Sequence, residues 1–316
     1  MDQLNHVLCD HTIRRFVKFI ITSRPHIPIA SHLTDVIRLP LVAENLKIDI
    51  AAFVEAKVLK ELQLVGSLGE EVQKALIDGA NGMFLWVSLI LNDLKNSSNT
   101  TPRAIRNTLK KLPPDLPGVY INIMRKIRKE DETAAQLILR WVVWALRPLR
   151  LQELTIAIAI LPRHTSMSSM EDDMHLDMRR VLRIVFGPML RIEDDDTVHL
   201  VHQSAKDFLV SMNTPNQGGV YSDLLHTFAL SSAKSNLQLV TSCLAYLSFD
   251  ECEDGPVTGE YKLDKNVRKN MKILKCKLPF LDYAATHWSE HARQADRSDD
   301  QILFRTFQKL ADSRQK

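Results

Sequence analysis

Apolar residues recur every three to four positions along most of this chain, which is the spacing of amphipathic helices. The clearest such segments are residues 48–64, 68–77, 83–94, 101–112, 119–128, 133–146, 151–161, 178–186, 221–248, 267–275, 280–293 and 301–311. Residues 163–175 are polar, show no period and are expected to form a loop. The pattern therefore predicts a mainly α fold with few strands.

Two apolar runs near the start have a different character. Residues 16–22 (FVKFIIT) and 36–39 are short and almost continuously apolar, as in strands buried in a parallel sheet. Arg24 follows the first run at the carboxyl end of the strand, where open α/β sheets place their ligands. Two strands do not make a stable sheet by themselves. We therefore interpret them either as the tail of a larger α/β domain or as strands that another element completes.

The apolar period changes from two to almost four within residues 198–210 (VHLVHQSAKDFLV), which predicts a strand followed by a helix. Ser204 lies at the change and is expected to cap the helix, with Asp207 as the carboxylate of a capping-box-like pair. His202 then ends the strand just before a helix N-terminus, where backbone N–H groups and the helix dipole favour an anion. Two interpretations of His202 follow: a phosphate-sensing side chain, or a partly buried histidine satisfied by a neighbour.

A winged-helix domain is predicted around this stretch. Residues 189–192 and 198–201 read as two short strands joined by an acidic loop, with helices before and after them. A winged-helix nucleic-acid-binding protein is therefore one alternative function. The acidic loop, residues 193–196, would repel phosphates, which argues against that alternative.

Composition narrows the classes of function further. The 316 residues are 45% hydrophobic and 25% charged with a net charge of +3, and no basic stripe with interleaved aromatic residues indicates nucleic-acid binding. The four cysteines are irregularly spaced, so we expect reduced thiols rather than disulfides or a zinc site. The first residues lack a secretory-signal pattern and no apolar stretch is long enough to span a bilayer, so we expect a cytoplasmic protein.

Two enzyme-like motifs have simpler explanations. His287 and His291 form an H-x-x-E-H pattern on a predicted helix, but no further His or Glu follows to complete a zinc site. Residues 199–207 contain the residue types of a hydrolytic triad, but in one short segment and without a G-x-S-x-G turn. Neither motif predicts catalysis or a metal site.

Several sequence strings occur in an order that resembles one family. They are KFIITSRP (18–25), RLPL (38–41), GANGMFLWV (79–87), LPPDL (112–116), RWVVWALRPLRLQEL (140–154), LVHQSAKDFL (200–209) and PFLDYAATHWSEHAR (279–293). With this order and spacing, residues 16–295 resemble the C-terminal part of a fungal NACHT-type STAND NTPase, of the NOD-like receptor class of signalling ATPases.

The resemblance implies nucleotide contacts for three residues. Arg24, in TSRP, would face the γ-phosphate as the family's sensor 1. Phe84 occupies the position where many relatives have a proline that packs on adenine. His202 would contact the β-phosphate of ADP and hold the receptor closed.

The P-loop of this family is not found in the sequence. None of the ten glycines stands in a G-x-x-x-x-G-K-[ST] frame, and no strand with an acidic Walker B pair precedes Phe16. We therefore predict no cofactor and no enzymatic activity for this chain alone, with ADP or ATP bound only if a P-loop is supplied upstream. A truncated gene model and a degenerate paralogue both explain these features.

The sequence as a whole predicts a mainly α regulatory module. Its predicted parts are the terminal strands of a P-loop NTPase sheet (1–42), a helical bundle (43–130), a winged-helix domain (131–212) and a trailing helical region (213–316). The expected partners are proteins, second copies of the chain included, and not membranes or nucleic acids. The expected function is nucleotide-gated conformational control within a signalling protein.

Overall fold

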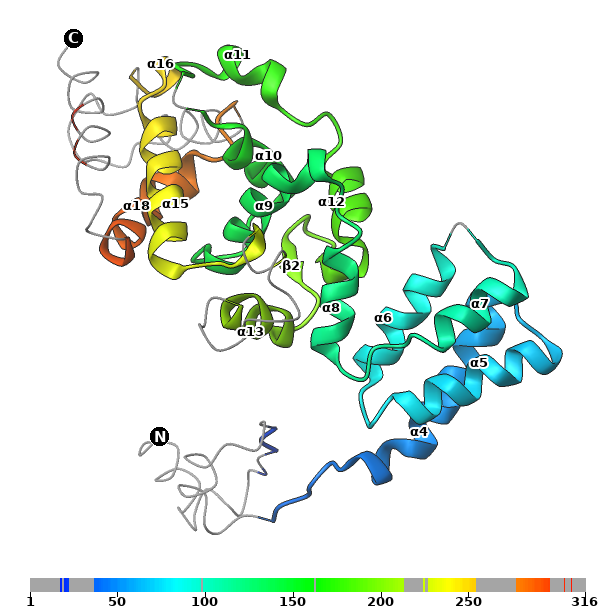
Figure 1. The fold of residues 1–316 in the computed structure, drawn as a ribbon. Coiled ribbons are helices and arrows are strands. Elements are labelled where there is room, and N and C mark those ends of the chain that lie inside the picture. Colours follow the sequence, from blue (N-terminus) through cyan, green and yellow to red (C-terminus); the bar gives the residue numbers. More distant parts are fainter. Residues whose placement is uncertain are drawn as a thin grey trace.

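The computed structural model is predominantly helical (Figure 1). It describes residues 18, 20–22, 37–97, 99–161, 163–212, 224, 227–253, 277–295, 304 and 308. A first group of helices, α4 to α7, lies to one side of a larger body that contains α8 to α18 (Figure 1). This architecture confirms the predicted mainly α fold.

The first group of helices is built around the buried indole of Trp86. Its elements are α4 (Ala43–Lys57), the π-helical turn η1 (Val58–Leu62), α5 (Gly66–Gly79), α6 (Phe84–Lys95) and α7 (Pro102–Leu109). Trp86 is 0% exposed, and its Nε1–H donates to the Pro113 carbonyl oxygen at 2.9 Å. α7 starts as its Thr-Pro signal predicts, because the Thr101 hydroxyl accepts the N–H of Ala104 and Pro102 takes the first helical position.

The strands predicted at 16–22 and 36–39 are not formed where the structure describes those residues. Residues 20–22 and 37–39 have no regular secondary structure, and Ile20 and Ile37 are each 93% exposed. A continuous apolar run becomes a buried strand only where a neighbouring strand pairs with it, and the described part of the chain offers none. The prediction of strands there was therefore wrong for these residues.

The larger body contains the predicted winged helix. Its elements are α8 (Leu116–Met124), η2 (Lys129–Asp131), α9 (Glu132–Trp144), α10 (Leu151–Ala159), α12 (Met178–Phe186), η4 (Gly187–Met189), β1 (Leu190–Ile192), β2 (Val198–Leu200) and α13 (Gln203–Ser211). β1 and β2 pair antiparallel, with Leu190 opposite Leu200. An isolated bridge between Arg150 and Thr197 ties this hairpin to the start of α10. The strands, the following helix and the helix at 178–186 are confirmed.

The segment 163–175 was expected to be a loop but contains two short helical turns, α11 (Met167–Met170) and η3 (Glu171–Asp173). Ser166 begins the first turn, because its hydroxyl accepts the N–H of Ser169. Side-chain capping and not apolar periodicity organises this segment, so the periodicity did not reveal it.

The C-terminal helices pack on the winged helix through aromatic side chains. They are α15 (Ser232–Leu247), α16 (Asp250–Glu253) and α18 (Leu281–Gln294), and α15 and α18 lie side by side in Figure 1. Trp141 of α9 meets Phe280 and Tyr283 edge-on, with ring centroids 5.4 and 5.7 Å apart. Helices predicted at 267–275 and, except for two residues, at 301–311 lie outside the described residues. Among the described helices, none has the length and apolarity needed to cross a membrane.

The close contact of Gly79 with Trp86 gives a stability test. A Cβ at Gly79 would lie 2.6 Å from the Trp86 ring, which is too close for a fully buried indole to accommodate without shifting. Helix propensity favours Ala over Gly by about 0.5–1 kcal/mol. We expect Gly79→Ala instead to lower the free energy of unfolding by about 1–3 kcal/mol, the cost of overpacking a core. Urea denaturation measures this; Ser88→Ala, at an exposed site of α6, is the control and is expected to be neutral.

Candidate functional site

The turn between β2 and α13 is organised by His202 itself. Its backbone is extended, and its ring nitrogen Nδ1 accepts the backbone N–H of Ser204 at 3.1 Å, which makes His202 the N-cap of α13. The Ser204 hydroxyl lies 2.8 Å from the same nitrogen and 2.8 Å from the Tyr120 hydroxyl. The predicted cap, Ser204, is therefore wrong, because an extended residue one step earlier already presents an acceptor to the first free N–H groups.

The predicted partner of that cap also takes another role. Asp207 accepts the side-chain amide of Gln203 at 2.9 Å, one turn away on the same helix. This is an ordinary contact between helix residues four apart. The capping-box-like pair between Ser204 and Asp207 is thus replaced by a His202 cap and a Gln203–Asp207 bond.

The capping bond fixes the chemistry of the exposed edge of His202. Because Nδ1 accepts a backbone N–H, a neutral ring carries its proton on Nε2. The residue is exposed, so this N–H is a donor at the start of a helix whose dipole is positive there. The arrangement can donate a hydrogen bond to an anion without losing the cap.

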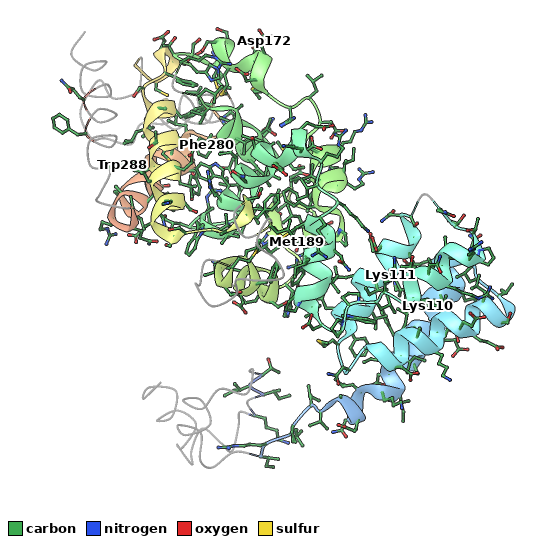
Figure 2. The ribbon with its side chains drawn as sticks, viewed as in Figure 1. Lys110, Lys111, Asp172, Met189, Phe280 and Trp288 are labelled. Atoms are coloured by element: carbon green, nitrogen blue, oxygen red, sulfur yellow. The ribbon has the colours of Figure 1, made fainter. Side chains whose placement is uncertain are left out.

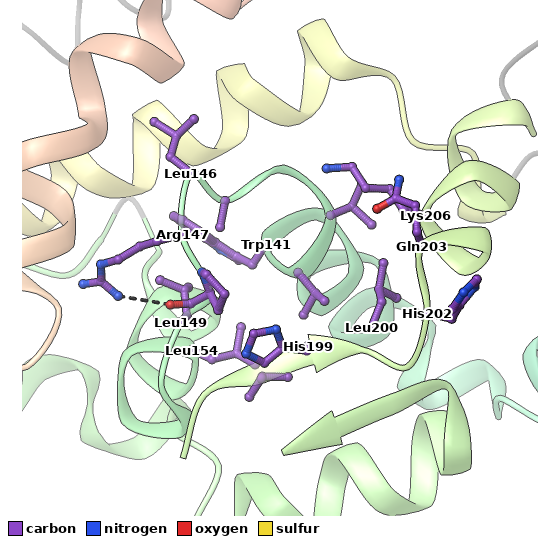
Figure 3. Close-up of a pocket in the computed structure, with 15 residues that line it drawn as sticks. Trp141, Leu146, Arg147, Leu149, Leu154, His199, Leu200, His202, Gln203 and Lys206 are labelled. Atoms are coloured by element: carbon purple, nitrogen blue, oxygen red, sulfur yellow. Dashed lines mark hydrogen bonds between the residues drawn. The ribbon is translucent and has the colours of Figure 1, made fainter. Parts of the chain in front are cut away.

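His202 lines a cavity of about 300 Å³ between β2, the start of α13 and the end of α9 (Figure 3). Its walls are Trp141, Val142, Val143, Ala145, Leu146, Arg147, Pro148, Leu149, Leu154, Val198, His199, Leu200, His202, Gln203 and Lys206. Apolar side chains form much of the wall, and most of the polar ones come from β2 and the first turn of α13. This combination is typical of a small-ligand site.

The positive charge available in this cavity comes from Lys206. Its ammonium lies 5.6 Å from the centroid of the Trp144 ring. Arg147 also lines the cavity, but Glu153 holds its guanidinium by two bonds of 2.8 and 2.7 Å. The hydrogen bond from Glu153 raises the pKa of Arg147, so this pair is an internal ion pair and adds little net charge to the cavity.

Two predicted site residues are not brought to this cavity. Phe84 opens α6 and packs edge-on against Phe53 with ring centroids 5.5 Å apart, and it does not line the cavity. Arg24 lies outside the described residues. Of the three predicted residues, His202 lines the cavity. Two residues that the sequence argument missed, Gln203 and Lys206, line it as well. No signal in the sequence marked Lys206, because a single lysine on a predicted helix is ordinary and His202, four residues earlier, lies before the helix begins.

The H-x-x-E-H motif is part of a packed polar network. His291 is 0% exposed, with Nε2 2.8 Å from the Tyr283 hydroxyl and Nδ1 2.7 Å from Asn236 Oδ1. The Tyr283 hydroxyl also accepts the backbone N–H of Leu146 at 3.0 Å. Both ring nitrogens are therefore engaged, and among the described residues no group of three or more potential metal ligands is found. The network joins α15 and α18 to the turn that lines the cavity.

Comparison with known proteins agrees with the class that the fold defines. Residues 121–231 match the family model described as the winged-helix domain of GPI inositol-deacylase. The vegetative incompatibility protein HET-E-1 of Podospora anserina is 29% identical over 209 residues, which is 61% of this chain and 14% of that protein. The chain thus spans a small part of this relative. No solved structure matches. These matches confirm the winged-helix domain and the predicted resemblance to the C-terminal part of a fungal NACHT-type STAND protein.

The cap can be tested apart from any ligand. We expect His202→Ala to lower the free energy of unfolding by about 0.5–2 kcal/mol, because the Ser204 N–H loses its acceptor. His202→Asn supplies a side-chain oxygen that is among the best N-caps, so it should recover most of this loss. Thermal and urea unfolding measure both variants. Equal destabilisation by Ala and Asn would contradict the capping role.

Burial of His291 makes stability depend on pH. Burial lowers the pKa of His291 to about 4, below the value of 6.5 for an exposed histidine. Between these pH values the unfolded chain binds a proton that the folded chain does not, so stability falls as the pH drops from 7 towards 4.5. We expect this residue to contribute about 1–3 kcal/mol to that fall. His291→Gln should be less stable at pH 7 yet show a weaker pH dependence; an unchanged dependence would contradict the assignment.

Proposed function

We propose that this chain is a regulatory segment of a NACHT-type STAND signalling protein, in which the winged helix responds to a bound nucleotide. The observation that carries the proposal is the His202 cap, because it directs a ring N–H outward at the positive end of α13. Lys206, in the first turn of α13, supplies a formal charge at the same cavity, and Figure 3 shows the His202 ring on the outer side of the turn between β2 and α13. A phosphate group is the ligand chemistry that this set of donors fits.

The cavity has a further unmet donor. Trp141 lines it and is 1% exposed, and its indole Nε1–H has no hydrogen-bond partner within the described part of the chain. A buried N–H without an acceptor costs about 1–3 kcal/mol. In the proposal, an acceptor atom on a bound ligand reaches this N–H and reduces that cost.

The nucleotide site would be completed by another segment. None of the ten glycines stands in a P-loop frame, so this sequence supplies no phosphate cradle of that kind. In the proposal, the winged helix contacts the phosphates from one side and a P-loop segment holds them from the other. Arg24 would contact the phosphates from the P-loop side. Chemistry on the nucleotide is therefore assigned to that other segment.

The response would reach the C-terminal helices through the turn at Leu146. The Tyr283 hydroxyl holds the Leu146 N–H, while Arg147 stacks on the Tyr283 ring at 5.1 Å. A shift of this cavity wall would therefore displace α18 and, through the hydrogen bonds of His291, also α15. We propose that this change controls binding of protein partners in the cytoplasm, in the broad kind of signalling that the name of the incompatibility relative indicates.

Nucleic-acid binding, the alternative function, is less well supported. The wing between β1 and β2 carries Glu193, Asp194, Asp195 and Asp196, and two arginines beside it, Arg179 and Arg191, are already engaged with Asp196 and Glu193. An acidic wing would repel a phosphate backbone. Strongly salt-dependent binding to duplex DNA would favour the alternative.

Titration of the chain with fluorescent ADP tests the proposal. We expect weak binding, with a dissociation constant on the order of 1 mM, because the chain supplies one side of the site. His202→Asn keeps the cap but replaces the outward ring N–H by a shorter side chain that does not extend as far, so it should weaken binding about tenfold, the effect of losing one hydrogen bond to a charged group. Lys206→Gln should also weaken binding and reduce its salt dependence.

The control is Lys110→Gln, an exposed lysine after α7 and away from the cavity, which should bind ADP like the unmodified chain. Equal affinity of the unmodified chain and His202→Asn would overturn the role of His202. Absence of any binding at 10 mM ADP, on the order of ten times the expected constant, would overturn nucleotide contact by this chain.

A further inference from the structure

α12 carries an exposed face that combines arginines with apolar side chains. The helix lies on the flank of the larger body opposite to α15 and α18 (Figure 1). Arg180, Arg183 and Ile184 are exposed on its outer side, Ile184 at 60%, and Leu176 is fully exposed just before the helix. Within the part of the chain that the structure describes, Arg180 and Arg183 form no ion pair. These four residues are called the α12 face below.

Exposed apolar residues beside unpaired arginines are typical of contact surfaces. Arginine is favoured at interfaces because its planar guanidinium binds carboxylates by two hydrogen bonds and tolerates partial burial. Single exposed apolar residues are ordinary, but here Ile184 lies on the same helix as the unpaired charges and Leu176 lies just before that helix. The chemistry that fits the α12 face is therefore an acidic surface with some apolar character.

The same domain offers an acidic surface next to the α12 face. The wing contains Glu193, Asp194 and Asp195, all exposed, and its last residue, Asp196, is ion-paired with Arg179 of α12 at 2.5 Å. The end of the acidic wing therefore contacts the first turn of α12, and Arg183 lies one helical turn further along that helix. Glu193 is engaged by Arg191 at 2.9 Å, whereas Asp194 forms no ion pair within the described part of the chain.

We propose that α12 and the wing form the contact of a homodimer. A basic face adjacent to an acidic one on the same molecule is self-complementary under a two-fold rotation, which sets each α12 face against the wing of the other copy. Arg180 and Arg183 then pair with Asp194 and Asp195 of the second copy, and Leu176 and Ile184 are covered. The contact lies on α12 and the wing, whereas Lys206 is on α13, and it does not depend on nucleotide binding.

A second copy fits this surface better than DNA does. DNA would bring phosphates towards the wing as well as towards the helix, and the wing acids would repel them. A second copy brings one acidic and one basic surface, so both sets of charges gain partners. The contact is small and largely charged, so the dimer is weak, with a dissociation constant on the order of 10–100 µM, and it weakens as salt increases.

Sedimentation equilibrium of the full chain tests the dimer by charge exchange. We expect Arg180→Glu/Arg183→Glu and Asp194→Lys each to raise the dimer dissociation constant at least tenfold, about 1.4 kcal/mol or more. Mixing the two variants should restore dimerisation to within a few fold of the unmodified chain, because each helix then faces a wing of opposite charge. Restoration also excludes misfolding as the cause of the loss.

Arg103→Glu/Arg125→Glu is the matched control, since both arginines are exposed but lie on α7 and after α8. This variant should dimerise like the unmodified chain. A monomeric unmodified chain at 200 µM, well above the expected constant, would overturn the proposal. So would loss in the separate variants without recovery on mixing, or tight binding of a 20-base-pair duplex that Arg180→Glu/Arg183→Glu abolishes.

Discussion

The side chain of Trp141 is the contact on which the two halves of the larger body both depend. Its indole is 1% exposed and lies between the cavity of the winged helix and the rings of Phe280, Tyr283 and His291. Figure 2 shows Phe280 beside the C-terminal helices, and Met189 deeper in the winged helix. Because one buried ring forms part of both surfaces, the cavity wall and the C-terminal helices cannot move independently without opening the core.

The polar network next to Trp141 restricts how α15 and α18 can pack on the winged helix. Apolar contacts alone would tolerate sliding of α18, whereas the chain from the Leu146 N–H through Tyr283 and His291 to Asn236 has one arrangement in which every group is satisfied. Burial keeps His291 neutral at physiological pH, so the network does not depend on a buried charge. A satisfied neutral network of this kind favours a single position of α15 and α18 over a range of them.

The sequence predicted the helices and the winged helix well, for a physical reason. Those elements bury one apolar face each, so the period of the pattern and the final structure share a cause, as in α12, whose predicted and observed bounds agree. The cap of α13 was misassigned because Ser204 is the better cap by type, whereas the extended backbone of His202 decides which side chain reaches the free N–H groups. Lys206 was missed because a single lysine on a helix carries no signal until the opposite wall is known.

The failure at residues 20–22 and 37–39 has the opposite cause. An apolar run predicts burial. It forms a strand only when a neighbouring strand pairs with it, and that pairing depends on the rest of the sheet and not on the run itself. The same reasoning applies to His202. Its cap is local and is therefore complete within this chain, whereas a phosphate between it and a P-loop requires a second wall. The described part of the chain thus contains the local half of the proposed nucleotide response: a donor fixed by its own cap, a lysine in the first turn of α13, and a buried ring in the wall of the same cavity that packs on the C-terminal helices.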